Sequence, residues 1–526
     1  MNEESLRTSG IRLLKKGKQG IVRALLSSRM GLFVALLAIQ ILIVVAVFYL
    51  FVEPPMHFFG LDLIISVVMV LHLINSRMDS TAKVTWLVAI MIATIPGTLL
   101  YLFTQSELGH RTLMKRISVI ADESVDKLPQ NKTAWQALRE RDKEAASLAH
   151  YMNHCTCHPV YRNTSVEYFP TGEDKWHEVL RQLENAKRFI FLEYFIIEEG
   201  LMWGTVLEVL ARKVKEGVEV RVMYDGSCAL TTLPYTYPQL MEGLGIKCRQ
   251  FAPVTPVLST HYNYRDHRKI LVVDGEVAFT GGVNMADEYI NHVEKFGHWK
   301  DVAIMLKGEA VRSFTLMFLQ MWNIREKVTE DFDPYLIAGT PVASEGFVVP
   351  YGDCPLDTDK MGERVYMSIL NRANDYVHIM SPYLILDDVM ATALKFAAER
   401  GVDVKLILPG IPDKRFPYAL AKNTYAELLD SGVQIYEYTP GFVHAKVFVA
   451  DDREAVIGTI NLDYRSLYHH FECAAWMYET PCIEDIEQDF QATLESCRKV
   501  EKNTIWEGHK LLFPLGKALK VIAPMM

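Results

Sequence analysis

Apolar residues form two kinds of pattern along this chain. Near the N-terminus they form long stretches, since Met30 to Val52 and Val84 to Thr104 each contain no charged residue. At about 1.5 Å per residue, each stretch is long enough to cross a bilayer core as a helix. Phe58 to Ile74 is a marginal third span because polar residues interrupt it, and Pro96 and Gly97 are expected to kink the last stretch. We therefore predict a transmembrane helical region with two or three spans.

Farther along the chain, shorter apolar runs alternate with amphipathic helical patterns. Helices are predicted over Val206 to Lys215 and Val389 to Arg400, between β-branched runs that are typical of buried strands. These patterns recur, because AKRFIFLEYFI at Ala186 to Ile196 resembles ANDYVHIMSPYL at Ala373 to Leu384. We therefore expect an α/β fold made of two pseudo-symmetric halves.

Each half of this repeat carries the same polar motif. HRKILVVD and HAKVFVAD both read HxKxxxxD, and a Gly and an Asn follow each histidine 14 and 17 positions later. Core packing gives no reason for such a repeat, so we interpret both copies as parts of one catalytic site between the halves. The residues concerned are His267, Lys269, Asp274, Gly281 and Asn284 in the first copy, and His444, Lys446, Asp451, Gly458 and Asn461 in the second.

The spacing of the motif predicts a strand and a hairpin. Residues two apart on a strand project from the same face, so each histidine is expected beside its lysine in one pocket. In the first copy, Ile270 to Val273 is predicted as a strand, Asp274 and Gly275 as a two-residue turn, and Val277 to Thr280 as the returning strand. The hairpin returns small residues and Asn284 to the histidine, where a tetrahedral anion can approach the backbone and accept a hydrogen bond. The aspartate of each copy lies at its turn and is interpreted as a structural anchor.

Each histidine also needs a partner that holds its second ring nitrogen in one tautomer. Glu472, in HHFECAAW, is the candidate partner of His444. The segment HWKDVAIM aligns with it and makes Asp301 the candidate partner of His267. The alternative interpretation of both carboxylates is an ordinary acid at the end of a strand.

Charge separates the N-terminal tail from the rest of the chain. Residues 1–29 hold seven Lys or Arg and two Glu, whereas the whole chain has a net charge of −9. This asymmetry favours a cytoplasmic N-terminus. Two spans would then place the catalytic region in the cytoplasm, whereas three spans would place it outside. An acidic main part also argues against a nucleic-acid substrate.

We predict five segments: a basic tail (1–29), a transmembrane region (30–104), a polar helical connector (105–160), a first half (161–340) and a second half with an apolar tail (341–526).

Three further stretches carry weaker signals. His154-Cys155-Thr156-Cys157-His158 is rich in metal-ligating side chains, but neighbours this close along the chain rarely all reach one ion. We interpret it as an ordinary loop and predict no metal site. The charged stretch from Leu108 to Leu148 is expected to be an exposed helical connector. Leu511 to Met526 is apolar and can lie against lipid or pack on the core.

Together these features resemble the phospholipase D superfamily and, within it, bacterial cardiolipin synthases. The resemblance rests on the two HxKxxxxD copies followed by GGxN and GTxN, on TGEDKWHEVLRQLENAKRFIFLEYFI, on TWLVAIMIATIPGTLLYLF and on the C-terminal APMM. It extends from about Leu61 to the C-terminus, whereas Met30 to Val52 is an additional apolar stretch.

The resemblance implies a transphosphatidylation in a multi-pass protein of the cell membrane. Two phosphatidylglycerol molecules would give cardiolipin and glycerol, without a metal or nucleotide cofactor. His267 would be the nucleophile that forms a phosphohistidine and His444 the acid, although the pattern alone does not distinguish them. The residues that would hold the phosphate oxygens are Lys269, Lys446, Asn284 and Asn461.

Other functions are compatible with the same residues. A membrane-anchored phospholipase D, or a phosphatidyltransferase with a different lipid substrate, would share every catalytic residue. A non-catalytic membrane scaffold would retain only the fold. The products formed from phosphatidylglycerol distinguish these alternatives, whereas the sequence indicates no oligomeric state.

Overall fold

The computed structural model describes residues 42, 46, 59–76, 78–105, 110–253, 264–337, 339–356, 359–507, 512–520 and 523. These residues divide into two compact units, which are treated separately. The larger unit contains Met114–Pro253 and Arg265–Gly516, and the smaller contains the preceding helices. Apart from Leu42 and Ala46, the predicted span Met30 to Val52 lies outside the described residues.

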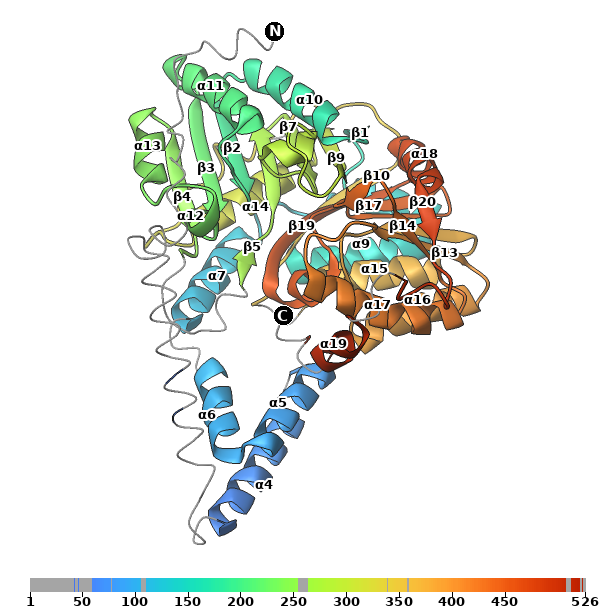
Figure 1. The fold of residues 1–526 in the computed structure, drawn as a ribbon. Coiled ribbons are helices and arrows are strands. Elements are labelled where there is room, and N and C mark those ends of the chain that lie inside the picture. Colours follow the sequence, from blue (N-terminus) through green and yellow to red (C-terminus); the bar gives the residue numbers. More distant parts are fainter. Residues whose placement is uncertain are drawn as a thin grey trace. The chain divides into compact units, whose positions relative to one another are not determined.

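The first half of the larger unit is built on a seven-stranded sheet. Its helices pack on both faces. Ile190, Leu192 and Tyr194 of β2 share a core with α10 and α11, whereas Phe191 of the same strand stacks on Phe318 of α14. The strands are, in spatial order, β1 (Thr164–Phe169), β9 (Ala303–Gly308), β7 (Val277–Gly281), β6 (Lys269–Val273), β2 (Phe189–Tyr194), β3 (Glu219–Asp225) and β4 (Lys247–Phe251) (Figure 1). The helices are α10 (Gly172–Glu184), α11 (Leu201–Lys215), α12 (Cys228–Thr231), α13 (Tyr237–Gly243), the short η3 (Asp287–Ile290) and α14 (Val311–Asn323).

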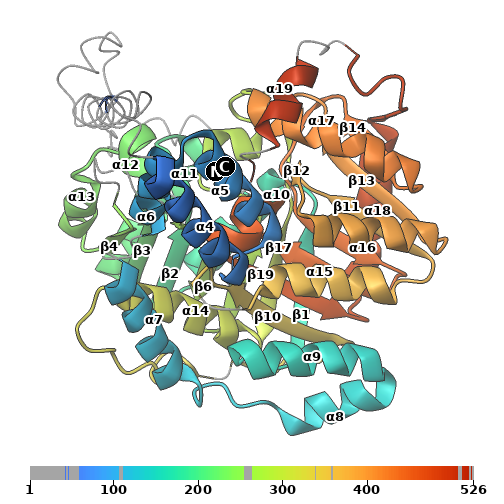
Figure 2. The same ribbon diagram turned by 90° about the horizontal axis from the view of Figure 1, so that it is seen from below.

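The second half repeats this arrangement (Figure 2). In both sheets three neighbouring strands are parallel and the hairpin strands are antiparallel. The second sheet has one additional antiparallel strand at its edge. The strands are, in spatial order, β10 (Phe347–Asp353), β19 (His470–Tyr478), β17 (Glu454–Gly458), β16 (Val447–Ala450), β11 (Tyr376–Met380), β13 (Asp403–Pro409), β14 (Gln434–Tyr438) and β20 (Cys497–Lys499). The helices are α15 (Met361–Arg372), α16 (Asp388–Glu399), α17 (Arg415–Asp430), the π-helical η4 (Arg465–His469) and α18 (Cys482–Glu495).

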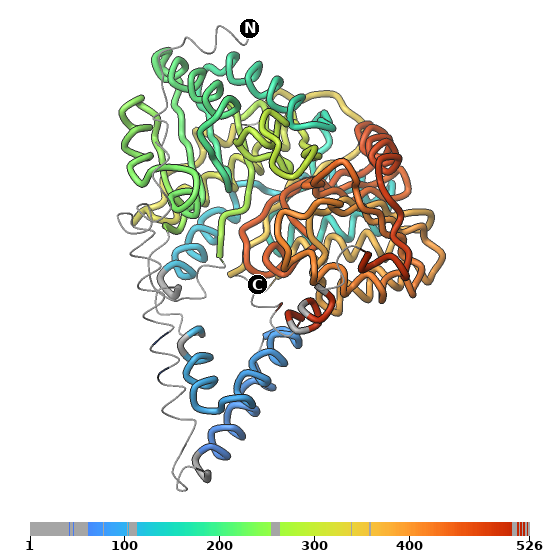
Figure 3. Tube along the Cα trace, in the orientation of Figure 1, coloured from blue at the N-terminus to red at the C-terminus, as the bar shows by residue number. Residues whose placement is uncertain are grey.

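The equal strand orders confirm the predicted pair of α/β halves. The two segments that resemble each other in sequence form β2 and β11, which hold the same place in their sheets. The predicted helices at 206–215 and 389–400 fall within α11 and α16. Figure 3 follows the chain from the green and yellow first half into the orange and red second half.

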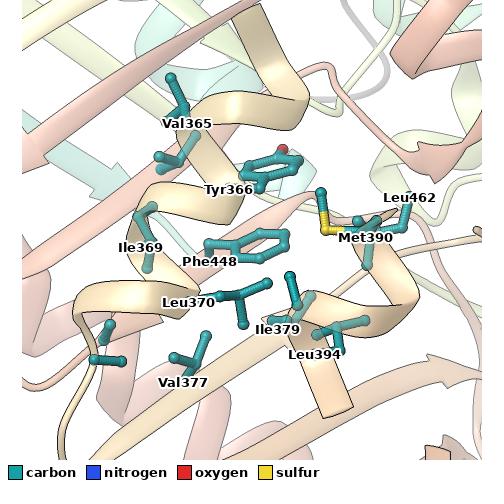
Figure 4. Close-up of a cluster of buried hydrophobic side chains, with 14 of the residues drawn as sticks. Val365, Tyr366, Ile369, Leu370, Val377, Ile379, Met390, Leu394, Phe448 and Leu462 are labelled. Carbon is teal, nitrogen blue, oxygen red and sulfur yellow. The ribbon is translucent and has the colours of Figure 1, made fainter. Parts of the chain in front are cut away.

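The core of the second half lies between its sheet and α15, α16 and α17. Tyr366 of α15 stacks on Phe448 of β16 with ring centroids 3.9 Å apart and planes inclined by 9° (Figure 4). Val377 and Ile379 of β11 fill the space beside this pair and are fully buried. Alternate residues of β11 face the other side, where His378 stacks on Phe490 of α18. The sheet is therefore covered on both faces, as its apolar strands predict.

The two halves exchange elements with each other. β5 (Arg265–Asp266) of the first half pairs in parallel with β19, and β8 (His298–Lys300) pairs in parallel with β15 (Gly441–Val443). In addition, α14 contacts β10 and α18 contacts β1, so the last helix of each half packs on the first strand of the other. β12 (Leu384–Ile385) and β18 (Leu462–Asp463) form a separate small pairing within the second half. These contacts join the halves into one body.

The stretch before the first half is not the exposed connector that the sequence predicts. It forms α7 (His110–Ser124), α8 (Lys132–Arg141) and α9 (Lys143–Thr156). Leu138, Ala145 and Met152 are fully buried in the core of the second half. Charged residues occupy the remaining faces of these helices, so composition alone concealed the apolar side that packs.

The smaller unit contains α4 (Phe59–Asn75), α5 (Ser80–Ile92) and α6 (Thr94–Gln105). The predicted span Val84 to Thr104 is two helices, because Ala93 has a non-helical backbone with φ of −151° and ψ of 89° and ends α5 three residues before Pro96. Gly97 lets α6 approach α5, since a Cβ at this position would lie 2.7 Å from the carbonyl oxygen of Ala89. Within the described residues, each helix is too short or too polar to cross a bilayer. The last helix among the described residues is α19 (Leu512–Leu519).

The aspartates of the two motifs anchor their hairpins. The carboxylate of Asp274 accepts hydrogen bonds from the backbone N–H groups of residues 187, 188 and 189 at 2.7 to 2.9 Å. Asp451 accepts the equivalent bonds from residues 374, 375 and 376 at 2.8 to 3.0 Å. The predicted two-residue turn is wrong, because Val273 pairs with Val277 and leaves a three-residue loop. Asp274 lies in that loop with φ of 56°.

Replacing Asp274 or Asp451 with Ala should lower the free energy of unfolding by about 2 to 3 kcal/mol, because three backbone donors lose a charged acceptor. Urea denaturation followed by tryptophan fluorescence measures the change. Glu495→Ala, at an exposed position near the end of α18, is the control. If both aspartate variants unfold within about 0.5 kcal/mol of that control, the anchoring interpretation is wrong.

Candidate active site

The first motif histidine follows a strand that belongs to one half and pairs with the other. Arg265 and Asp266 of β5 lie beside His470 and Phe471 of β19. The pairing continues one residue further, because the backbone N–H of His267 donates to the carbonyl of Phe471 at 2.9 Å. The next residue of β19 is Glu472, so this carboxylate lies beside the imidazole of His267.

The second motif histidine is positioned by the equivalent pairing. Gly441 to Val443 of β15 lie beside His298 to Lys300 of β8. The backbone N–H of His444 donates to the carbonyl of Lys300 at 2.7 Å. The residue that follows is Asp301, which therefore faces the imidazole of His444.

Each histidine is consequently bound to a carboxylate of the opposite half. Nδ1 of His267 lies 2.9 and 3.0 Å from the two oxygens of Glu472, and Nδ1 of His444 lies 2.6 Å from Oδ2 of Asp301. The predicted pairing of Glu472 with His444 and of Asp301 with His267 is wrong. Alignment of the two halves identified the correct carboxylates, but the exchange of β5 and β8 between the halves reverses their partners.

The residues after each returning strand make room for these carboxylates. A Cβ at Gly282 would lie 2.0 Å from Oδ1 of Asp301, so only glycine fits at this position. Thr459 stands at the equivalent place in the second half, and its hydroxyl donates to Glu472. The small residue of the first motif therefore serves the Asp301 side chain, whereas the sequence predicted that it would serve an approaching anion.

The lysines fold back towards the histidines of their own motifs. Nζ of Lys269 donates to the carbonyl of His267 at 2.8 Å, and Nζ of Lys446 lies 2.9 Å from Nδ1 of His444. Both lysines are buried. The histidines precede β6 and β16 rather than lying within them. The histidine and lysine of each motif are therefore not two residues of one strand, as the spacing had predicted. The predicted contact between each histidine and its lysine is nevertheless present.

Burial sets the protonation of the two imidazoles. It lowers the pKa of His267 well below the ordinary 6.5, and, with the charge of Lys446, it lowers the pKa of His444 to about 4. The charge of Lys269 is a further cause of the lowered pKa at both histidines. One ammonium group therefore acts on imidazoles from both halves, which indicates that the two motifs lie around a common centre.

The carboxylates stay ionised in this environment. Burial alone would raise the pKa of Glu472, but its interaction with His267 outweighs burial and holds the pKa below its usual range. Asp301 is affected in the same way by His444. Each ionised carboxylate favours a proton on Nδ1 of its histidine, which leaves the lone pair of Nε2 available for chemistry.

Burial also lowers the pKa of the lysines, to about 8 for Lys269 and about 7 for Lys446, although Glu472 and Asp301 respectively oppose the change. Lys175 of α10 belongs to the same group, because burial lowers its pKa to about 7 and both Asp301 and Lys269 act on it. Its ammonium donates to the carbonyl of Val283 at 3.0 Å. Lys175 lies outside both motifs, so the motif pattern did not predict it.

The two motif asparagines are buried, but their amides are not equivalent. Asn284 donates to the hydroxyl of Tyr289 at 2.7 Å and accepts from the backbone N–H of Ile196 at 3.0 Å. Nδ2 of Asn461 lies 3.4 Å from Asp463, while its Oδ1 has no hydrogen-bond partner within the described part of the chain. Their predicted contact with phosphate oxygens stays a prediction.

The cysteine and histidine run at 154–158 is the end of a helix, not the loop that was predicted. Cys155 lies in the last turn of α9, and Cys157 ends the helix in the left-handed region with φ of 58°. Nε2 of His158 accepts a hydrogen bond from the backbone N–H of Gly352 at 2.9 Å. This run therefore caps a helix and contacts β10.

This arrangement suits chemistry on a phosphate diester. Two imidazoles with free Nε2 lone pairs can supply a nucleophile and a proton carrier. The ammonium groups of Lys269, Lys446 and Lys175 can stabilise negative charge in a site from which water is largely excluded. The site lies where the halves exchange strands, so neither half can form it alone.

Comparisons with known proteins agree with this geometry. A family model described as "Cardiolipin synthase, PLD-like domain" matches residues 179–322 and 366–494, one segment in each half. An uncharacterized protein of Streptococcus mutans is 54% identical over 458 residues, which cover 87% of this chain and 99% of that protein. A cardiolipin synthase of Halalkalibacterium halodurans is 32% identical over 434 residues, or 81% of this chain and 86% of that enzyme.

A solved structure shows the same fold. The crystal structure of phosphatidylserine synthase from Haemophilus influenzae superposes with a TM-score of 0.54 at 15% identity. The superposition covers 69% of this chain and 95% of that chain. Both α/β halves of the larger unit therefore belong to a known two-half architecture.

Glu472→Gln and Asp301→Asn should each lower kcat by about 1,000-fold to 10,000-fold, because an amide no longer favours the Nδ1 proton of the histidine. Turnover of a chromogenic aryl phosphodiester measures the effect. Glu487→Gln is a matched control, since Glu487 binds Nδ1 of the buried His378 at 2.9 Å but lies outside the site. A loss of less than about tenfold in both site variants would contradict the role of the crosswise pairs.

Proposed function

The chain belongs to the cardiolipin synthase family with phospholipase D-like domains, and from this premise we propose that it joins two phosphatidylglycerol molecules into cardiolipin and releases glycerol. An enzyme of this family is a phosphatidyltransferase that acts on phospholipids. The observation that carries the proposal is the crosswise pairing of His267 with Glu472 and of His444 with Asp301. It prepares two imidazoles, one from each half, with their Nε2 lone pairs free.

In the first step, Nε2 of His267 attacks the phosphorus of one phosphatidylglycerol. A phosphorus–nitrogen bond forms, and the bond from phosphorus to the headgroup glycerol oxygen breaks. His444 donates a proton to that oxygen, so free glycerol leaves. Burial keeps His444 neutral in the empty site, but a bound phosphate anion favours its protonated form. The assignment of His267 as nucleophile follows the family resemblance.

In the second step, the phosphatidyl group passes to the second lipid. Neutral His444 accepts the proton of a glycerol hydroxyl from another phosphatidylglycerol, and the oxygen attacks the phosphohistidine. The phosphorus–nitrogen bond breaks, and cardiolipin is released while His267 regains its neutral form. One phosphodiester replaces another, so the exchange needs no external source of energy.

The buried lysines stabilise the charge that builds up on phosphorus in both steps. Lys269 and Lys446 lie next to the histidines, and Asn284 and Asn461 would complete the contacts to the non-bridging oxygens. Water must stay out, because hydrolysis of the intermediate would give phosphatidic acid. The histidines are only 5% and 7% exposed, which supports this exclusion.

The proposal includes attachment of the enzyme to a bilayer by its N-terminal region. The helices α4, α5 and α6 expose large apolar side chains, among them Leu63, Ile64, Met91 and Ile92. A lipid surface would cover these side chains and supply both substrates at high local concentration. A membrane span within Met30 to Val52, and a boundary between the halves near residue 340, are further parts of this proposal.

Purified protein incubated with phosphatidylglycerol vesicles, without added metal or nucleotide, should form cardiolipin and glycerol in equal amounts. Lipid chromatography and an enzymatic glycerol assay measure the two products. His267→Ala and His444→Ala should each reduce the rate by at least about 1,000-fold, whereas His378→Ala, at a buried histidine of another cluster, should retain it. Phosphatidic acid as the main product would instead identify a hydrolase.

The dependence of kcat/KM on pH should be bell-shaped. On the acid side, activity falls as His267 gains a proton. The pKa of His267 lies well below 6.5, so this limb of the profile also lies well below pH 6.5. On the alkaline side, activity falls as Lys446 and Lys269 lose protons near their pKa values of about 7 and about 8. Lys446→Arg should shift the alkaline limb upward, because arginine keeps its charge. A flat profile between about pH 5 and 9 would contradict this assignment.

A further inference from the structure

A third buried group, His470, adjoins the pair formed by His267 and Glu472. Nδ1 of His470 lies 3.5 Å from Oε1 of Glu472, and the rings of the two histidines have centroids 5.3 Å apart. His470 is 7% exposed, and its Nδ1 forms no hydrogen bond within the part of the chain that the structure describes. A buried nitrogen whose nearest carboxylate oxygen lies as far as 3.5 Å away is poorly satisfied, so this atom calls for an explanation.

The equivalent position in the other half carries no ligand atom of this kind. Alignment of HHFE with HWKD places Trp299 opposite His470. The ring of Trp299 lies 5.5 Å from that of His444, much as His470 lies beside His267. Both positions thus supply an aromatic ring next to a motif histidine. Only His470 adds a basic nitrogen, so packing alone does not require histidine there.

We propose that His267, His470 and Glu472 bind one divalent transition-metal ion and that this ion holds the enzyme inactive. One ligand atom from each residue lies within 4.8 Å of the others. Two imidazole nitrogens and a carboxylate oxygen suit a borderline ion such as Zn²⁺, with water in the fourth position. Among the described residues, these three form the group with this spacing.

Inhibition follows from the two nitrogens of an imidazole, and this consequence rests on the proposed function. Nδ1 of His267 faces Glu472 and His470, so the ion would take the lone pair of that nitrogen. The proton that Nδ1 carries then moves to Nε2, directly or through solvent. Neutral His267 then has its proton on Nε2, which can no longer attack phosphorus. Imidazole has no third nitrogen to compensate.

The same surroundings make the ion removable. The charge of Lys269 acts on His267 and repels a dication, whereas Glu472 supplies a single negative charge. In the other half, Lys446 lies 2.9 Å from Nδ1 of His444 and occupies the corresponding side of that ring. The inhibitory site is therefore expected beside one motif only, and a chelator should restore activity.

The test uses the full-length protein and compares His470→Asn with His378→Asn. His378 is a buried histidine bonded to Glu487 and serves as the matched control. Calorimetric titration with Zn²⁺ alone, without lipid, measures binding, and the absorption spectrum with Co²⁺ reports the ligands. Cardiolipin formation is then measured at increasing Zn²⁺, with a final addition of chelator. His470→Gln provides a second variant in case the asparagine variant is unstable.

Wild-type protein and the His378 variant should bind one Zn²⁺ ion tightly and lose activity as that site fills. The His470 variants should bind Zn²⁺ at least about tenfold more weakly, because changes even to residues that only contact a metal ligand weaken binding by that much. They should therefore need correspondingly more Zn²⁺ for inhibition. Equal affinity in wild-type and His470 variants would overturn the proposal, as would full activity with the site filled. Failure of the proposed lipid reaction itself shows as absence of cardiolipin before any Zn²⁺ is added.

Discussion

The hydrogen bonds between the histidine of one half and the carboxylate of the other are the interaction on which the rest of the site depends. Glu472 and Asp301 are fully buried, and a buried carboxylate without a partner is strongly unfavourable. Their partners come from β5 and β15, which pair with strands of the opposite half. Association of the halves and preparation of the imidazoles are thus the same event, so a separated half would bury a charge without its counterpart.

The duplication that builds the site is not perfectly symmetric, and the differences make the two histidines chemically distinct. Thr459 donates to Glu472, whereas Gly282 only leaves space for Asp301. Both lysines donate to the carbonyl of their own histidine, but only the ammonium of Lys446 also lies within 2.9 Å of Nδ1 of that histidine. Two chemically equivalent imidazoles would have no reason to divide the roles of nucleophile and proton carrier. A few substitutions in an otherwise repeated arrangement are therefore sufficient to make the two histidines chemically different.

The sequence predicted the repeated α/β halves and the identity of the paired carboxylates, because strand periodicity and motif offsets are local properties. It failed where distant segments meet. Nothing in the linear pattern shows that β8 leaves its own half, so Asp301 was predicted beside the wrong histidine. The apolar faces of α8 and α9 were hidden by their charged composition, and Lys175 lies in a helix far from either motif. HHFE and HWKD did contain a usable signal for His470, since their alignment sets a histidine against a tryptophan.

The balance of charge explains why the site is prepared for an anion. Three ammonium groups, those of Lys175, Lys269 and Lys446, lie near the carboxylates of Glu472 and Asp301. Burial disfavours the charged form of these lysines and lowers the pKa of all three. A phosphodiester carries one negative charge, so its arrival favours the fully protonated lysines. Binding of the substrate thereby favours protonation of the lysines that stabilise its transition state. These lysines are therefore most fully charged when substrate is bound.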